Sequence, residues 1–254
     1  MTHLSGQERA QFVQSMFSRI AHRYDLMNRL MTGFQDVRWR RQVIQLAKLT
    51  PHASLLDLGS GTGDLAFEAL EQNPQTRVTA ADFTLEMMRV GQARGRLDWC
   101  AADALRLPFD DASFDAVVSG FLMRNVIDLP KAIQEQHRVL KPRGRIVILD
   151  TTRPKRNLLS PFIWIHMHLV IPTLGGLLSG FRDAYCYLPD STEGFVTAEK
   201  LAAHLVAAGF KTVGCQRLMF DTIAIHWGEK GETALTEGKS KARELLDEVE
   251  TRNT

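Results

Sequence analysis

The sequence predicts an α/β protein built on a doubly wound, mostly parallel sheet of seven strands. Short β-type runs alternate with helical patterns through the middle of the chain, and a glycine-rich turn follows the first of these runs. Hydrophobic residues make up 44% of the 254 residues, which is enough to bury a sizeable core. Parallel strands joined by right-handed helical crossovers satisfy such an alternation.

Two helices are expected ahead of the sheet. Apolar residues recur at helical spacing from Phe12 to Leu30, a Thr32-Gly33 pair interrupts them, and a second apolar series begins at Val37. We expect residues 1–50 to form an N-terminal helical lid.

The sheet itself is expected from runs that are rich in β-branched and apolar residues. Five strands are predicted at residues 54–58, 77–82, 97–103, 114–120 and 144–151, with helices at 63–72, 84–95 and 130–140 between them. A helix capped at Thr197 and stopped by Gly209 should precede a closing β pair at 211–219 and 221–228. The charged stretch 229–254 is expected to be a flexible tail.

A nearly uncharged apolar insert, residues 157–190, interrupts this rhythm. Pro161, Pro172 and the Gly175-Gly176 pair break it before it reaches the roughly 20 residues of a membrane span. The insert could be a dimer face, ordinary core, or a lid over a lipophilic substrate. Open α/β sheets bind ligands beyond the carboxyl ends of their strands, which favours the lid. The apolar wall of this lid would then comprise Phe162, Trp164, Met167, Leu169 and Ile171.

Composition excludes several classes of protein. The net charge of +2 argues against a dedicated nucleic-acid binder, and the three cysteines form neither a disulfide framework nor a zinc site. No secretory signal is expected, so we predict a cytoplasmic protein. Residues 138–156 hold seven basic residues against one acid, and this run is either a solvated rim or a surface attracted to the inner face of an anionic membrane.

The glycine turn lies in the stretch LLDLGSGTGDLA, residues 55–66. A Walker loop is unlikely because Gly63 is followed by Asp64 and Leu65 rather than by Lys and a hydroxyl residue. Closely spaced glycines let the backbone approach a ligand, and carboxylates at the ends of the next strands, Asp82 and Asp103, can hold a nucleoside. Nicotinamide binding and a purely structural turn are the alternatives.

This combination resembles the class I methyltransferases that use S-adenosylmethionine. The resemblance implies that the glycine loop faces the methionine and sugar, that Asp82 holds the ribose, and that the Asp103-Ala104 pair meets the adenine. The cofactor-binding residues that it implies are Tyr24, Asp57, Gly59, Gly61, Thr62, Gly63, Asp82, Phe83, Asp103, Ala104 and Gly120. No metal is required.

Four further stretches narrow the resemblance. They are YDLMNRLMTGFQDVRW (24–39), FLMRNVID (121–128), RVLKPRGRIVILDTT (138–152) and LLSGFRDAYCYLPDS (177–191). Over residues 17 to 228 the chain resembles the UbiE/MenG/COQ5 family of quinone C-methyltransferases, which methylate the ring of polyprenyl benzoquinols or demethylmenaquinols. The chain departs from the family pattern at Thr32, Asp36, Leu122, Arg143, Asp150 and Thr152.

The same resemblance implies catalytic roles for Arg124, Asn125 and Tyr185. Arg124 and Asn125 would face the acceptor oxygen, with Arg124 orienting water and stabilising a phenolate, unless Arg124 pairs with Asp128 or Asp150 at the surface. Tyr185 and Tyr187 would line the acceptor channel, unless they are core residues.

Two residues in the N-terminal segment also admit more than one role. Tyr24 would lie over the donor, unless it is a core aromatic of an amphipathic helix. Asp36 would act as a base or, as we favour, cap the second helix.

These expectations converge on a C-methyltransferase that uses S-adenosylmethionine to methylate a reduced polyprenyl quinol, with peripheral membrane contact and a homodimer as further expectations. Only the reduced ring is electron-rich enough to attack a methyl group. Two alternatives stay open: a methyltransferase of another lipophilic or aromatic small molecule, and a cofactor-binding paralogue without chemistry.

Overall fold

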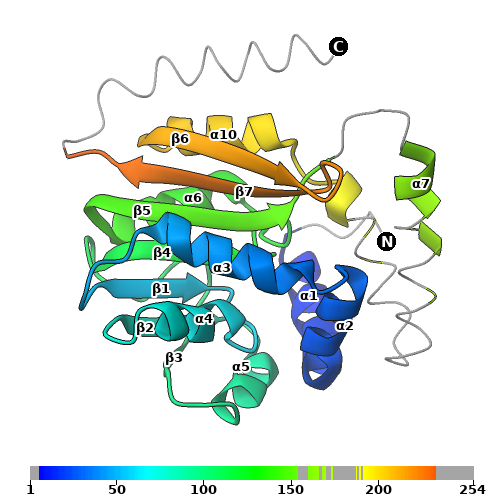
Figure 1. The fold of residues 1–254 in the computed structure, drawn as a ribbon, viewed down its shortest axis with the longest axis horizontal. Helices are drawn as coiled ribbons and strands as arrows, with labels where there is room; N and C mark the ends of the chain where they lie inside the picture. The colour runs from blue at the N-terminus through cyan, green and yellow to red at the C-terminus, as the bar shows by residue number, and fades with distance from the viewer. Residues whose placement is uncertain are drawn as a thin grey trace.

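The computed structural model describes residues 6–153, 160–165, 168, 169, 173, 187, 189 and 191–232. Seven strands form one sheet in the order β3-β2-β1-β4-β5-β7-β6 (Figure 1). The strands are β1 Ser54–Leu58, β2 Arg77–Asp82, β3 Asp98–Ala101, β4 Phe114–Gly120, β5 Leu140–Thr151, β6 Phe210–Leu218 and β7 Ile223–Lys230. Strands β1 to β5 are mutually parallel and β7 is antiparallel to both of its neighbours, so the predicted fold class is confirmed.

Helices cover both faces of the sheet because its strands bury side chains in both directions. Alternate residues of β5 belong to different cores: Ile146 and Ile148 pack with one helix pair, Val147 and Leu149 with the other. The first pair is α6 (Leu129–Val139) with α10 (Ala198–Ala207), and the second is α3 (Gln35–Ala47) with α4 (Asp64–Gln72). A further helix, α5 (Leu85–Gln92), links β2 to β3.

Helix starts follow ordinary capping chemistry where the sequence provides it. The carboxylate of Asp128 accepts the Lys131 N–H at 2.9 Å at the start of α6, and Pro130 occupies the first turn. The hydroxyl of Thr197 accepts the Lys200 N–H at the start of α10, as predicted.

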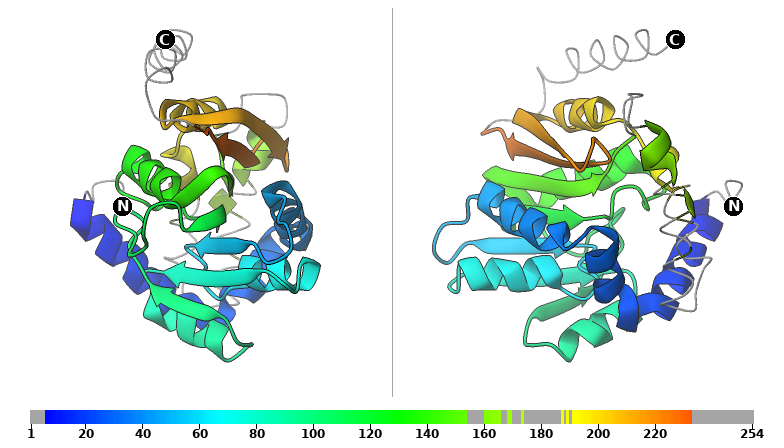
Figure 2. Two further views of the ribbon diagram at one scale, coloured as in Figure 1. Left: turned by 90° about the vertical axis from the view of Figure 1, so that its left-hand side faces the viewer. Right: turned by 45° about the vertical axis from the view of Figure 1, so that its right-hand side comes forward.

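The N-terminal segment contains three helices where two were predicted. A 3-10 turn, η1 (Ala21–Arg23), separates α1 (Gly6–Ile20) from α2 (Tyr24–Met31). The turn redirects the chain so that Met16 and Ile20 of α1 and Met27 of α2 bury in one small cluster. Figure 2 shows α1 and α2 standing at the edge where the parallel strands end.

Two strand boundaries differ from the prediction for identifiable reasons. The fifth strand was predicted to start at Gly144, but β5 starts earlier, at Leu140, and its pairing with β4 shifts register between Phe114 and Ala116. The closing strand β7 runs to Lys230, beyond the predicted end at residue 228. The Lys230 ammonium donates to the carbonyls of His137 and Leu140, each at 2.7 Å, and so ties the strand to the end of α6.

The apolar insert is described only in part. Helix α7 spans Ser160–Ile165, and the side chains of Trp164 and Leu169 are exposed. The predicted roles of Phe162, Met167, Ile171 and Tyr185 fall on side chains outside the described set. Among the helices that the structure describes, none has both the length and the hydrophobicity to cross a bilayer.

Gly91 of α5 allows the glycine turn to pack closely on the helix. A Cβ at this position would lie 2.2 Å from the Trp99 ring and 2.8 Å from the carbonyl oxygen of Thr62. We predict that Gly91→Ala lowers the free energy of unfolding by about 1–3 kcal/mol through overpacking, although alanine is the better helix former.

Chemical denaturation of the full chain measures this effect, and Gln92→Ala, an exposed change in the same helix, is the control. A Gly91→Ala protein as stable as the wild type would show that the turn and the ring can withdraw at no cost.

Candidate functional site

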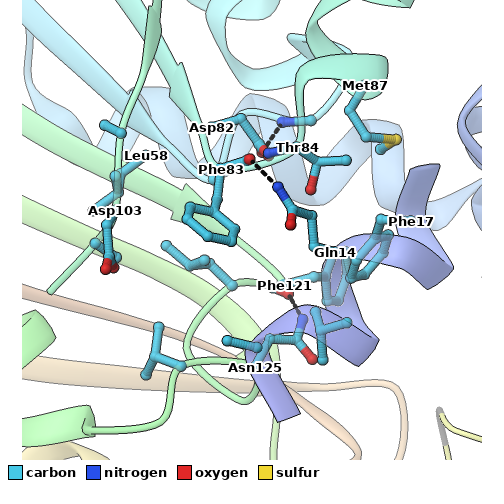
Figure 3. A pocket seen from close by; sticks show the side chains of 18 of the residues that line it. Gln14, Phe17, Leu58, Asp82, Phe83, Thr84, Met87, Asp103, Phe121 and Asn125 are labelled. Carbon is cyan, nitrogen blue, oxygen red and sulfur yellow. Dashed lines mark hydrogen bonds between the residues drawn. The ribbon is translucent and has the colours of Figure 1, made fainter. Parts of the chain in front are cut away.

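A pocket opens at the carboxyl ends of the strands, where the strand order reverses between β1 and β4. This is the position at which doubly wound sheets bind ligands. Its walls come from the ends of β1, β2, β3 and β4 and from one side of α1 (Figure 3). The space, with its open mouth, is about 920 Å³.

The glycine turn forms one wall through backbone that only glycine takes easily. Gly59, Gly61 and Gly63 all have left-handed φ, at 67°, 56° and 86°. A Cβ on Gly59 would lie 2.8 Å from the Leu122 side chain. The turn is pinned to β2, because the Gly59 and Ser60 N–H groups both donate to the Ala81 carbonyl.

Asp82 holds this wall to the next one. Its Oδ2 accepts the Gly61 N–H and its Oδ1 accepts the Thr84 N–H, each at 2.7 Å. Burial raises the pKa of Asp82, and the amide hydrogen bonds act against that rise. One carboxylate thus fixes the glycine turn relative to the loop after β2. Figure 3 shows Asp82 next to Thr84 on that loop.

Asp57 lies at the end of β1 beside a small adjoining cavity. Its Oδ2 accepts the Ala66 N–H at 3.0 Å, while its buried Oδ1 has no hydrogen-bond partner in the structure. Burial, reinforced by the carboxylates of Asp82 and Asp64, raises the pKa of Asp57 to about 8. A buried acceptor without a donor is a place where a cationic or hydrogen-bonding ligand group would be stabilised.

The structure brings most of the predicted cofactor residues together. The main pocket is lined by Tyr24, Gly59, Gly61, Asp82, Phe83, Asp103, Ala104 and Gly120. The adjoining cavity is lined by Asp57 and Thr62, and Tyr24, Gly59, Gly61 and Gly120 border both spaces. Gly63 lines neither space and instead precedes α4, for which it supplies the N-cap.

Tyr24 joins the lid to the pocket. Its ring makes an edge contact with Phe17 of α1, with centroids 5.6 Å apart, and burial raises the pKa of its phenol. The ring therefore packs in the small helical cluster and also borders the two cavities, and its placement over the donor stays a prediction.

Asn125 lines the pocket on the side that follows β4. Its Nδ2 donates to the Phe121 carbonyl at 3.0 Å, and its Oδ1 accepts the Tyr187 hydroxyl at 3.2 Å. The amide is therefore held in one orientation, with one N–H and one oxygen lone pair left for a ligand. Tyr187 in turn contacts Phe12 of α1, with ring centroids 5.8 Å apart.

Arg124 lies beside the pocket rather than in its wall. The Arg124 Nη1 is 2.7 Å from Asp150 Oδ1, and the backbone N–H of Arg124 donates to Asp150 Oδ2. The guanidinium lies over the Phe121 ring. The predicted alternative of a pair with Asp150 is the one observed, but it is buried, with side chains only 7% and 1% exposed. The predicted direct contact between Arg124 and an acceptor is therefore replaced by a contact that fixes the loop carrying Asn125.

Asp36 neither caps a helix nor borders a cavity. Phe34 is the residue before α3, and Asp36 lies inside its first turn, fully buried. Its carboxylate accepts the Thr32 hydroxyl at 3.0 Å and pairs with Arg40 at 2.9 Å. Two of the departures from the family pattern, Thr32 and Asp36, are thus hydrogen-bonded to each other.

The basic run 138–156 is paired along much of its length. Lys141 contacts Asp115, Arg143 contacts Glu232 and Arg145 contacts Glu229, while Arg138 pairs with Glu135 and Asp111. These residues lie where β5 begins, at the opposite edge of the sheet from the pocket. The part of the run from Arg138 to Arg145 is therefore a paired rim away from the pocket. Arg153 follows the other end of β5 and donates to the Glu193 carbonyl, and Lys155 and Arg156 lie outside the described residues.

The polar contacts of α1 were missed at the sequence level. Gln14 donates to the Phe83 carbonyl at 3.0 Å, Ser18 to Glu86 at 2.8 Å, and Arg9 to the Arg124 carbonyl at 2.7 Å. The helix therefore connects the β2 side of the pocket to its β4 side. Periodicity predicts a helix here, but nothing in the sequence indicates which loops its polar residues reach.

Solved structures share this architecture at low sequence identity. A putative methyltransferase from Haloferax volcanii, solved with a methyltransferase activator, matches 85% of this chain and 97% of its own, at a TM-score of 0.62 and 16% identity. A methyltransferase from Thermotoga maritima described as S-adenosylmethionine-dependent matches 85% of this chain and 98% of its own. The TM-score is 0.60 and the sequence identity is 18%. These likenesses concern the fold alone.

Sequence relatives are much closer. A protein of Desulfotalea psychrophila named as a ubiquinone/menaquinone biosynthesis C-methyltransferase is 44% identical over 86% of this chain and 90% of its own length. A demethylmenaquinone methyltransferase of Thermus thermophilus is 44% identical over 85% of this chain and its whole length. The model of the ubiE/COQ5 methyltransferase family matches residues 2–230. The chain is therefore a methyltransferase and belongs to the ubiE/COQ5 methyltransferase family.

Proposed function

We propose that this enzyme uses S-adenosylmethionine to methylate a ring carbon of a reduced polyprenyl quinol, either a demethylmenaquinol or a benzoquinol precursor of ubiquinone. One observation carries the proposal: the glycine turn with Asp82 and the oriented amide of Asn125 line a single pocket. The relatives named for quinone methylation support the choice of acceptor.

The residues fit the proposed cofactor. Asp82 uses one lone pair of each oxygen for the loops and keeps others for ribose hydroxyls. Asp57 offers its unpartnered Oδ1 to the charged amino-acid end, and the exposed ring of Phe83 with Ala104 offers apolar surface to the adenine. When bound, S-adenosylmethionine supplies a methyl group on a cationic sulfur for in-line displacement.

Apolar residues around Asn125 fit a lipophilic ring. Phe121, Leu122, Val126 and Ile127 line the pocket on this side, and Leu122 also lies against Gly59. A quinol carbon becomes nucleophilic when the neighbouring hydroxyl loses its proton, and the proposed role of Asn125 is to hold that oxygen through its remaining N–H.

Arg124 is assigned a positioning role in this proposal. Its pair with Asp150 fixes the backbone from Phe121 to Asn125, so it acts on the acceptor through Asn125. The guanidinium is engaged by Asp150 and by the Phe121 ring, so the proposal gives it no role as a base.

The bridging role of Asp82 predicts the effect of its loss. In Asp82→Asn the side chain keeps one acceptor oxygen, so one of the Gly61 and Thr84 amides loses its partner. We expect S-adenosylmethionine binding to weaken by about 1–3 kcal/mol, or between about fivefold and about 150-fold, as measured by calorimetry.

Asp98→Asn is the control, because this exposed carboxylate lies at the start of β3, at the end of the strand away from the pocket. Hydrogen exchange at the Gly61 amide should accelerate only in Asp82→Asn. Equal affinity losses in both variants, with unchanged exchange, would contradict the bridging role.

The raised pKa of Asp57 predicts a pH dependence. A cationic amino-acid end favours the Asp57 anion, so binding of S-adenosylhomocysteine should release a proton below pH about 8 and strengthen by up to about tenfold per pH unit toward that value. In the ligand-free protein the sign is opposite: the free energy of unfolding falls between pH about 4 and about 8, because the unfolded carboxyl ionises first.

Calorimetry at pH about 7 in two buffers of different ionisation enthalpy counts the released proton. Asp57→Asn keeps an oxygen for the Ala66 N–H but cannot ionise, so its proton release should be smaller. The same release in both proteins would place the titrating group elsewhere.

The proposed function is tested in a bacterial host that lacks its own quinone C-methyltransferase. Mass spectrometry of its quinones should show the demethylated species gaining one methyl group when this chain is expressed, and the converted species identifies the ring. Asn125→Ala should still bind S-adenosylmethionine while converting at least about tenfold less quinone. A wild-type protein that binds the cofactor and converts no quinone would point to another lipophilic acceptor.

A further inference from the structure

The outer surface of α2 and of the first turn of α3 is apolar. Leu26, Leu30, Phe34 and Val37 follow one another at spacings of four, four and three residues, and their exposed fractions are 56%, 38%, 61% and 36%. Figures 1 and 2 show both helices meeting at the edge of the sheet where the parallel strands end, and the pocket is lined by residues at this edge. We call these four residues the apolar strip.

Other exposed hydrophobic residues lie at the same edge. Phe83 and Leu85 follow β2 and Ile127 follows β4, and Phe83 and Ile127 also line the pocket. Phe220 forms the turn between β6 and β7, next to the carboxyl end of β5, because Ile223 pairs with Thr151.

The remaining exposed apolar residues of the described part of the chain come from the insert that follows β5. They are Trp164, Ile165 and Leu169, and Figure 1 places α7 beyond the ends of the strands. The described residues therefore concentrate their large exposed hydrophobic side chains at the pocket edge, which is unusual for a surface that faces only water.

The backbone at Phe34 is strained. Its φ is 62°, a left-handed conformation that costs a bulky residue free energy, and the preceding Gly33 has a φ of 58°. Asparagine or glycine would be more stable here, so the exposed phenyl ring contributes nothing to the fold that explains its presence.

Charge on this surface has one sign. Arg29 and Arg38 are exposed beside the apolar strip. Both acids of residues 23–41 are directed away from it: Asp25 accepts the Thr62 hydroxyl and pairs with Arg94, and Asp36 is fully buried against Arg40. Apolar side chains with flanking arginines are complementary to a bilayer that carries anionic headgroups.

We propose that the apolar strip docks this enzyme on an anionic lipid bilayer, with the pocket mouth facing the membrane. Phe34 and its neighbours enter the headgroup region and Arg29 and Arg38 contact lipid phosphates. The proposal rests on the proposed function only for the acceptor, since a quinol held in the bilayer would then reach the pocket without crossing water.

Sedimentation of the full-length protein with vesicles tests this docking. Phosphatidylcholine vesicles that contain about one-third phosphatidylglycerol should bind the wild-type protein at least about tenfold more tightly than phosphatidylcholine alone. Leu30→Gln with Phe34→Asn should weaken binding at least about tenfold, and asparagine relieves the strain at residue 34, so unfolding does not account for the loss.

Arginine variants supply the matched control. The double variant Arg29→Gln, Arg38→Gln should weaken binding to the anionic vesicles. The double variant Arg77→Gln, Arg96→Gln should leave binding unchanged, because both arginines lie where β2 and β3 begin, at the edge of the sheet away from the pocket. Equal binding by the wild type and the strip variant would overturn the proposal. The proposal would also be overturned if the strip variant differed from the wild type only in having half its mass in analytical ultracentrifugation, because the strip would then be a contact between two copies.

Failure of docking and failure of the proposed function are distinguishable. The strip variant should methylate a short-chain, water-soluble quinol as fast as the wild type and lose rate only with acceptor carried in vesicles. Loss of rate on both acceptors would place the strip in the site itself and contradict the docking role. Vesicle binding by a wild-type protein that methylates neither quinol would support docking and refute only the acceptor assignment.

Discussion

A buried carboxylate shared by two loops sets the geometry of this pocket. Asp82 closes β2 and accepts one amide from the glycine turn and one from the loop that leads into α5. Because both bonds are about as short as charged hydrogen bonds become, the two walls move together or not at all. The Gly59 approach to Leu122 and the packing of Gly91 under Thr62 then follow from where this carboxylate places the turn.

Local patterns predicted the sheet, the glycine turn and the carboxylates of Asp82 and Asp103, because buried parallel strands are continuous apolar runs and their polar ends meet at one edge. The other pocket residues were implied by the family resemblance. The sequence offered the Arg124–Asp150 pair only as a surface alternative. It did not reveal that this pair is buried or that Gln14 reaches Phe83, because each contact joins residues more than 25 positions apart. Asp36 was misjudged for a related reason: its position beside a turn suggested a cap, but the turn is made by Phe34.

A network of charges explains how the N-terminal helices are held. Asp64 contacts Arg40 of α3 and Arg94 beyond α5, and Arg94 also contacts Asp25 of α2. Burial and the neighbouring Asp64 carboxylate raise the pKa of Asp25, and Thr62 and the two arginines act against that rise. Helix α2 is therefore attached to the glycine turn through the Asp25 carboxylate, which contacts Thr62 and Arg94. Helix α1 is attached by hydrogen bonds from Arg9, Gln14 and Ser18, the last of them to the Glu86 carboxylate.

The antiparallel strand β7 lies between β5 and β6 although it comes last of the three in the chain. During synthesis β5 therefore has an open edge until residues 223–230 have left the ribosome, and β6 has no neighbour in the sheet before then. The loops that form the pocket, all encoded earlier, can be in place while this edge is still unpaired. The strand that closes this edge is therefore encoded after every loop of the pocket, which leaves the edge of β5 open to pairing with other chains until β7 is made.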